Sequence, residues 1–111
     1  MKLDPFDVVV VPFPYSDRLT EKRRPALVVS SREMPANTGR IWVAMITSVK
    51  SSELGDVAIE DFAACGLPVP STLRASKITT LDLSRITRRA GRLSDVDQQL
   101  ARRALMACAG F

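Results

Sequence analysis

The residues of this sequence that are best suited to chemistry stand just before an apolar run. In the stretch TEKRRPALVVS, residues 20–30, Arg24 directly precedes Pro25, with Lys22 and Arg23 behind it. Proline belongs at the first position or on the edge of a strand, and it keeps the preceding residue extended. We therefore expect Pro25 to begin a buried strand that holds Arg24 rigidly at its start. A guanidinium stays protonated and can bind two phosphate oxygens at once, which favours stabilisation of negative charge. The alternative is a solvated cation with no chemical role.

Histidine is absent from the sequence, which removes the commonest general base and the commonest metal ligand. Any chemistry must therefore use Arg, Lys, Ser, Thr, Tyr, Cys or carboxylates. The two cysteines, Cys65 and Cys108, lie far apart and each stands among alanines. This pattern is typical of small buried side chains in a reducing compartment. We expect no disulfide, no metal and no cofactor.

Composition indicates one soluble globular domain over residues 1–111, with 46% hydrophobic and 25% charged residues. The net charge of +4 permits nucleic-acid binding without establishing it. The N-terminus lacks the pattern of a signal peptide, and no apolar run approaches the length of a membrane span. We expect a cytoplasmic protein that does not associate with membranes.

Runs of β-branched and apolar residues, separated by segments rich in Pro, Gly, Asn and charge, predict a series of short strands. The predicted strands cover residues 7–13, 25–30, 41–47, 57–59, 72–78 and 86–89. Residues 14–23 and 31–40 are expected to be loops, and TTLDLSR, residues 79–85, a turn or a short 3₁₀ element.

The C-terminal segment has helical periodicity instead. Ser94 is the expected N-cap, Asp97 follows three residues later, and Gly110 is expected to end the helix. The predicted apolar stripe that packs on the sheet consists of Val96, Leu100, Ala104 and Ala107. Many short strands followed by one helix predict a mainly β protein, a small barrel or curved antiparallel sheet with a C-terminal α-helix.

Four segments, in this order and spacing, resemble the PemK/MazF family, the toxin components of type II toxin–antitoxin systems. They are DVVVVPFPYSD, KRRPALVVS, VAMITS and STLRASKITTLDLSRI. The resemblance implies an SH3-like β-barrel of the CcdB/PemK kind and a homodimer. It also implies a metal-independent, sequence-selective endoribonuclease that cuts single-stranded RNA and is silenced by a cognate antitoxin.

The resemblance assigns catalytic roles to Arg24, Thr47 and Arg74. RNA can be cut by its own 2′-hydroxyl, which attacks the adjacent phosphorus. In this reaction Arg24 would stabilise charge on the phosphorane, and Thr47 would offer its hydroxyl to a phosphate oxygen or orient Arg24. Arg74 would act as an acid or as a second phosphate clamp.

Five further residues are predicted to contact RNA: Tyr15, Arg23, Ser48, Ser76 and Lys77. Tyr15 could stack on a base. Some family members carry an aspartate at the position of Ser76, and many carry an arginine at the position of Thr79. The first departure leaves the general base unidentified. The second removes an expected RNA contact, for which Lys77 is a candidate replacement.

Two non-enzymatic interpretations remain open at this point. The chain could be a CcdB-like toxin that binds a protein target such as gyrase, or an inactive family member retained as an antitoxin-binding or autoregulatory module. A pure binder has no need of the RRP and ITS segments together, which favours the nuclease.

Several of these residues also have structural interpretations. Arg74 could pair with Asp82 or Glu60. Arg88 and Arg89, in the segment RITRRAGR, could belong to a stripe that binds RNA or could protect a sheet edge. Trp42 could belong to the core or to a dimer interface.

Overall fold

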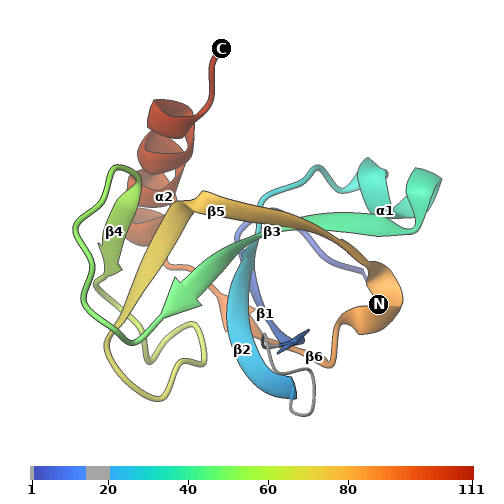
Figure 1. The fold of residues 1–111 in the computed structure, drawn as a ribbon, viewed down its shortest axis with the longest axis horizontal. Coiled ribbons are helices and arrows are strands. Elements are labelled where there is room, and N and C mark those ends of the chain that lie inside the picture. Colours follow the sequence, from blue (N-terminus) through green and yellow to red (C-terminus); the bar gives the residue numbers. More distant parts are fainter. Residues whose placement is uncertain (1, 15–20) are drawn as a thin grey trace.

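The computed structural model describes residues 2–14 and 21–111, which form a curled, half-open β-barrel with one C-terminal helix (Figure 1). The elements in chain order are β1 (Asp7–Pro14), β2 (Glu21–Val28), α1 (Glu33–Thr38), β3 (Arg40–Thr47), β4 (Asp56–Ile59), β5 (Ser71–Asp82), the 3₁₀ turn η1 (Leu83–Arg85), β6 (Arg88–Arg92) and α2 (Asp95–Cys108). One antiparallel sheet has the strand order β4-β5-β3-β2-β1-β6, so β4 and β6 are its edges. The predicted mainly β fold with a C-terminal helix is confirmed.

Each face of the sheet carries a buried core, because α2 covers part of one face, over β4 and β5, and the curl of the sheet encloses the other. This explains the unbroken run of valines in β1, since a strand with one solvated face would alternate. The core on the face that α2 covers, called the helix face, includes Val8, Leu27, Ala44, Ile46, Leu73, Leu93 and Ala101. The core on the opposite face includes Leu3, Val9, Val11, Ala26, Val28, Ile41, Val43 and Ile86.

Helix α2 begins as predicted, with the Ser94 hydroxyl accepting the backbone N–H of Asp97 at 3.2 Å. Its buried face was predicted wrongly: Asp97 and Ala101 are buried, whereas Val96 is 59% exposed. The two carboxylate oxygens of Asp97 accept the backbone N–H groups of residues 60 and 61, each at 2.9 Å. These bonds turn a polar residue inward and fasten the helix to the segment after β4. The helix ends at Cys108 with Ala109 extended, so Gly110 is not its cap.

Three other boundaries differ from the prediction. The expected loop at residues 31–40 contains α1, which tolerates Pro35 in its first turn and ends at Gly39, whose φ is +72°. Strand β5 continues through residues 79–82, because its pairing with β3 extends to Arg40 opposite Asp82. Only η1 is 3₁₀, and β6 begins two residues later than predicted.

Strand β2 begins at Glu21, four residues before Pro25, so the prediction that Pro25 starts the strand is wrong. Strand β1 pairs with β2 from Val8 to Pro14, whereas the ladder of β2 with β3 covers only Ala26 to Val28. The stretch up to Pro25 is therefore an edge on the β3 side, as expected of a residue that lacks an N–H. No helix in the described part of the chain is long and apolar enough to span a membrane.

Candidate functional site

Arg24 and Thr47 lie on neighbouring strands, beyond the end of the ladder that joins them. The β2–β3 ladder pairs Val28 with Val43 and Ala26 with Met45, and it ends there. Arg24 and Thr47 each lie two residues beyond that last pair. Arg24 also pairs with a core residue of the opposite face across the β1 ladder, which assigns its side chain to that face. Both residues are partly buried, so their side chains are confined at the end of the ladder.

Thr47 is fixed by its own backbone neighbourhood. Its hydroxyl oxygen accepts the backbone N–H of Val49 at 3.1 Å, at the point where β3 ends. This bond uses an acceptor site of the oxygen and leaves the hydroxyl hydrogen able to donate. Thr47 also pairs with Thr72 of β5.

Arg74 lies in the next row of the same face, where it pairs with Met45 on one side and Asp56 on the other. Its Nη2 is 2.7 Å from Oε2 of Glu53, and its Nε donates to Oδ1 of Asp56 at 3.3 Å. The guanidinium is thus held by two carboxylates, one row away from Thr47.

Asp56 organises this cluster. Its side chain is 1% exposed, and its Oδ2 accepts the backbone N–H of Glu53 at 2.9 Å. A hydrogen bond with the Ser51 side chain, together with the bonds from Glu53 and Arg74, holds the pKa of Asp56 below its ordinary value of 3.8, although burial acts in the other direction. Asp56 therefore stays ionised and fixes both the turn and the arginine.

Two structural interpretations are decided by these contacts. Arg74 is ion-paired, but the expected partners Asp82 and Glu60 are wrong. Arg89 lies on the edge strand β6, where its Nη2 is 3.2 Å from Oδ1 of the buried Asp7. The edge-protecting interpretation of Arg89 agrees with this position.

Arg23 does not share a sheet face with Arg24. It pairs with Pro12 and lies on the helix face, because neighbouring residues of a strand point to opposite faces. There it lines a pocket of about 270 Å³ together with Arg88. The other lining residues are Val10, Pro25, Gly66, Leu67, Pro68 and Ala90.

The remaining predicted RNA contacts are scattered. Ser76 and Lys77 are exposed in an irregular stretch of β5, between the pairs Met45–Arg74 and Ala44–Ile78. Tyr15 lies outside the described residues. Ser48 directly follows Thr47 and lines a hydroxyl-rich pocket of about 590 Å³. That pocket is also lined by Lys50, Ser51, Ser52, Ala58, Ile59, Pro70, Ser71 and Thr72.

Sequence reasoning missed Glu53, Asp56 and the hydroxyl pocket. The signal available was the polar segment SVKSSELGD that follows the ITS motif, but its role depends on the pairing of β4 with β5. In the described part of the chain, no group of three or more acidic or cysteine side chains could hold a metal ion.

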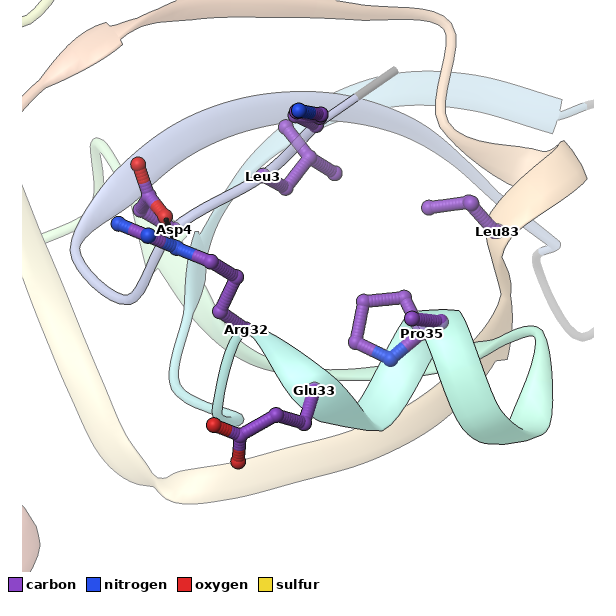
Figure 2. A pocket seen from close by; sticks show the side chains of 8 residues that line it. Leu3, Asp4, Arg32, Glu33, Pro35 and Leu83 are labelled. Atoms are coloured by element: carbon purple, nitrogen blue, oxygen red, sulfur yellow. Dashed lines mark hydrogen bonds and ion pairs between the residues drawn. The ribbon is translucent and has the colours of Figure 1, made fainter.

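Another pocket lies near the start of β3, far along the strand from Thr47 (Figure 2). Its lining comes from the N-terminal segment, α1 and η1: Lys2, Leu3, Asp4, Arg32, Glu33, Pro35, Ala36 and Leu83. Asp4 and Arg32 form an ion pair at its rim. It contains none of the predicted site residues.

Comparison with known proteins gives one consistent result. The family model of PemK-like, MazF-like toxins of type II toxin–antitoxin systems matches residues 4–108. A probable endoribonuclease MazF from Mycolicibacterium smegmatis is 34% identical over 92 residues, which cover 83% of this chain and 84% of that protein.

Solved structures share the fold. An endoribonuclease in complex with its cognate antitoxin, from a mycobacterial species, matches with a TM-score of 0.79 and 18% identity, covering 98% of this chain and 96% of that one. A MazE–MazF structure from Deinococcus radiodurans matches with a TM-score of 0.75 and 21% identity, covering 95% and 94%.

Proposed function

Because the chain belongs to the family of PemK-like, MazF-like toxins of type II toxin–antitoxin systems, we propose that it is a sequence-selective, metal-independent endoribonuclease that cleaves single-stranded RNA. The observation that carries the proposal is the position of Arg24 and Thr47 on neighbouring strands, each two residues beyond the last pair of the β2–β3 ladder. The non-catalytic interpretations are not favoured, because the similar curated protein is named an endoribonuclease.

In the proposed reaction the 2′-hydroxyl of the RNA attacks the adjacent phosphorus and the 5′-oxygen leaves. Charge accumulates on the non-bridging oxygens of the phosphorane, and the rigid fork of Arg24 matches two of them. The Thr47 hydroxyl donates a further hydrogen bond from the facing strand. Donors that are fixed before the reaction stabilise the transition state without reorganisation.

The direct test is incubation of the purified protein with long single-stranded RNA in the presence of EDTA, followed by mapping of the new 5′ ends. Cuts that recur at one short sequence, and that disappear with Arg24→Ala, support the proposal. RNA that stays intact with the folded parent protein contradicts it.

We propose that the protein acts as a homodimer in the cytoplasm. Trp42 and Ile78 are 47% and 48% exposed, so the core interpretation of Trp42 is wrong. They are diagonal neighbours across β3 and β5 on the helix face, because Trp42 pairs with Thr80 and Ile78 with Ala44. Adjacent exposed apolar side chains favour a covered surface. Light scattering at micromolar concentration should give a dimer, and Trp42→Glu should give a folded monomer; a monomeric parent protein contradicts the proposal.

We also propose a cognate antitoxin whose acidic and apolar segment binds the basic surface. The support is the net charge of +4 and the cationic residues on both sides of β2. Similar solved structures include complexes with a cognate antitoxin. Addition of the candidate antitoxin should abolish RNA cleavage at equimolar concentration. Tight binding that leaves cleavage intact would contradict this mode of inhibition.

A further inference from the structure

The hydroxyl pocket of about 590 Å³ adjoins the row of the sheet that contains Thr47. Thr47 pairs with Thr72 of β5, and Thr72 pairs on its other side with Ala58 of β4. Residues directly opposite each other on antiparallel strands have Cβ atoms about 4.5–5.5 Å apart. Thr72 and Ala58 both line the pocket, and so does Ser48, which directly follows Thr47. An RNA strand with a phosphate on Thr47 therefore brings a neighbouring nucleotide to this pocket.

The pocket contains hydrogen-bonding groups that the fold does not use. Within the described part of the chain, the side chains of Ser48, Ser52 and Thr72 have no hydrogen-bond partner. A hydroxyl both donates and accepts, so a group of three matches the mixed donors and acceptors on the edge of an unstacked base. Sequence-specific proteins read single-stranded RNA through such base edges. The volume also lies in the range of about 300–1,000 Å³ that is usual for small-molecule sites.

The charge of the pocket favours a nucleotide over a cationic ligand. Lys50 lines the pocket and makes no ion pair with any residue in the ranges 2–14 and 21–111. None of the lining residues is acidic. An ammonium group only donates hydrogen bonds, and it neutralises a phosphate of the bound strand.

The loop that forms one wall of the pocket is held in place by contacts within the protein. Ser51 lines the pocket and forms a hydrogen bond with the side chain of the buried Asp56. Asp56 also accepts the backbone N–H of Glu53 at 2.9 Å and Nε of Arg74 at 3.3 Å. This carboxylate thus ties the loop after β3 to β5, the strand that supplies Thr72. Groups that are fixed by their neighbours bind a ligand without the entropic cost of ordering them.

We infer that the hydroxyl pocket binds the nucleotide next to the cleaved bond, and that Ser48, Ser52 and Thr72 read its base. The inference rests on the proposed function and assigns its sequence selectivity to one part of the site. A base with the wrong pattern of donors and acceptors leaves hydroxyls unpaired in the pocket, and this cost discriminates between sequences. Arg74 and Asp56 are positioning residues, because they act on the base through the loop that they hold.

The test is cleavage of an RNA pool of random sequence in EDTA, with the cut sites counted by sequencing the new 5′ ends. Ser48→Ala, Ser52→Ala and Thr72→Val each remove one hydroxyl, and valine keeps the β-branched shape of threonine. Each variant should weaken the base preference at the same position of the recognised sequence by about 2- to 12-fold, the net contribution of one hydrogen bond. Ser84→Ala is the matched control, because Ser84 is an exposed serine of η1, beside the start of β3, and it should cut as the parent does.

Two further variants separate reading of the base from other roles. Lys50→Ala should weaken the binding of all RNA sequences alike, and the slope of log affinity against log salt concentration should become shallower by about one. Arg74→Ala should relax the base preference at the same position as Thr72→Val. An arginine that contacted only the phosphate would instead lower the rate equally at every sequence.

Thermal melts verify that each variant is folded. If the folded hydroxyl variants keep the base preference of the parent, or lose rate equally at every sequence, the inference is wrong while the proposed function stands. If the parent protein cleaves no RNA, the proposed function fails and the inference fails with it.

Discussion

Arg24 on β2 and Thr47 on β3 each lie two residues beyond the pair of Ala26 with Met45, the last of the ladder between these strands. The ladder stops before them at Pro25, which has no N–H to contribute. A hydroxyl and a guanidinium therefore lie on neighbouring strands, at the end where these strands are no longer paired.

Replacement of Arg24 tests the proposed charge stabilisation. Arg24→Ala should lower the single-turnover cleavage rate by about a hundredfold or more, the usual cost of losing one preorganised donor. Arg24→Lys should recover little, because a point charge cannot reproduce the planar fork. Thermal melts serve as the folding control, and a folded Arg24→Ala that cuts at the parent rate removes Arg24 from the mechanism.

Thr47→Ala should also slow cleavage, and the double variant with Arg24→Ala should be far less than multiplicative. Residues that act on the same transition state as one unit lose most of their joint effect when either is removed. The measurement is a double-mutant cycle of single-turnover rates. Fully multiplicative effects would mean that the two side chains act independently.

Arg23 and Arg24 should differ although they are neighbours, because they lie on opposite faces of β2. Arg23→Ala should leave the cleavage rate at saturating RNA unchanged. If Arg23 contacts a phosphate, Arg23→Ala should make the slope of log RNA affinity against log salt concentration shallower by about one. Binding curves at several salt concentrations measure this. A loss of rate as large as that of Arg24→Ala would contradict the assignment of the two faces.

Asp97→Ala should destabilise the protein by about 1–3 kcal/mol, because it leaves two partly buried N–H groups without their acceptor. Asp95→Ala is the matched control, since Asp95 is exposed in the same helical turn. Urea unfolding of the two variants gives the comparison. If Asp97→Ala and Asp95→Ala have the same free energy of unfolding, the hydrogen bonds that Asp97 accepts from residues 60 and 61 do not stabilise the fold.

The contribution of Asp56 to stability should depend on pH. Its pKa in the folded protein is lowered, chiefly through the Ser51 hydrogen bond, so the folded state binds fewer protons than the unfolded state as acid is added. The stabilisation is complete above the ordinary value of 3.8 and is lost as the pH falls through the lower folded value. The difference in free energy of unfolding between the parent and Asp56→Asn should therefore shrink below about pH 4. A constant difference between pH 3 and pH 6 contradicts this.

Gly91→Ala should lower the melting temperature. A Cβ at this position would lie 2.6 to 2.9 Å from backbone atoms of Cys65, where β6 passes the turn after β4. Overpacking against backbone costs about 1–3 kcal/mol. Gly110→Ala is the control, because nothing lies within 4 Å of its added Cβ, and its melt should match that of the parent.

The sequence predicts the strands well where both sheet faces are buried, since their apolar runs are continuous, as in β1 and β3. The sequence fails to predict a polar residue that is buried because it accepts backbone N–H groups. Nothing in the pattern of α2 distinguishes Asp97 from a solvated residue of the first helical turn. It also fails at α1, because Pro35, Asn37 and Gly39 are residues typical of turns. In the site, Arg24 and Thr47 come from motifs, whereas Glu53 and Asp56 come together with Arg74 only through strand pairing between β4 and β5.

The pairing of β1 with β6 has a consequence for the time course of folding. Asp7 and Arg92 lie 85 positions apart in the chain, yet the ladder joins them directly. The entropy of closing so long a loop is lost before its contacts are gained, and sheets dominated by such pairs fold over about milliseconds to seconds. The pairs β1–β2 and β2–β3 join strands that are consecutive in the sheet-forming order of the chain, so they close much shorter loops. We therefore expect the strands that carry Arg24 and Thr47 to pair early, and the edge that β6 completes to set the overall rate of folding.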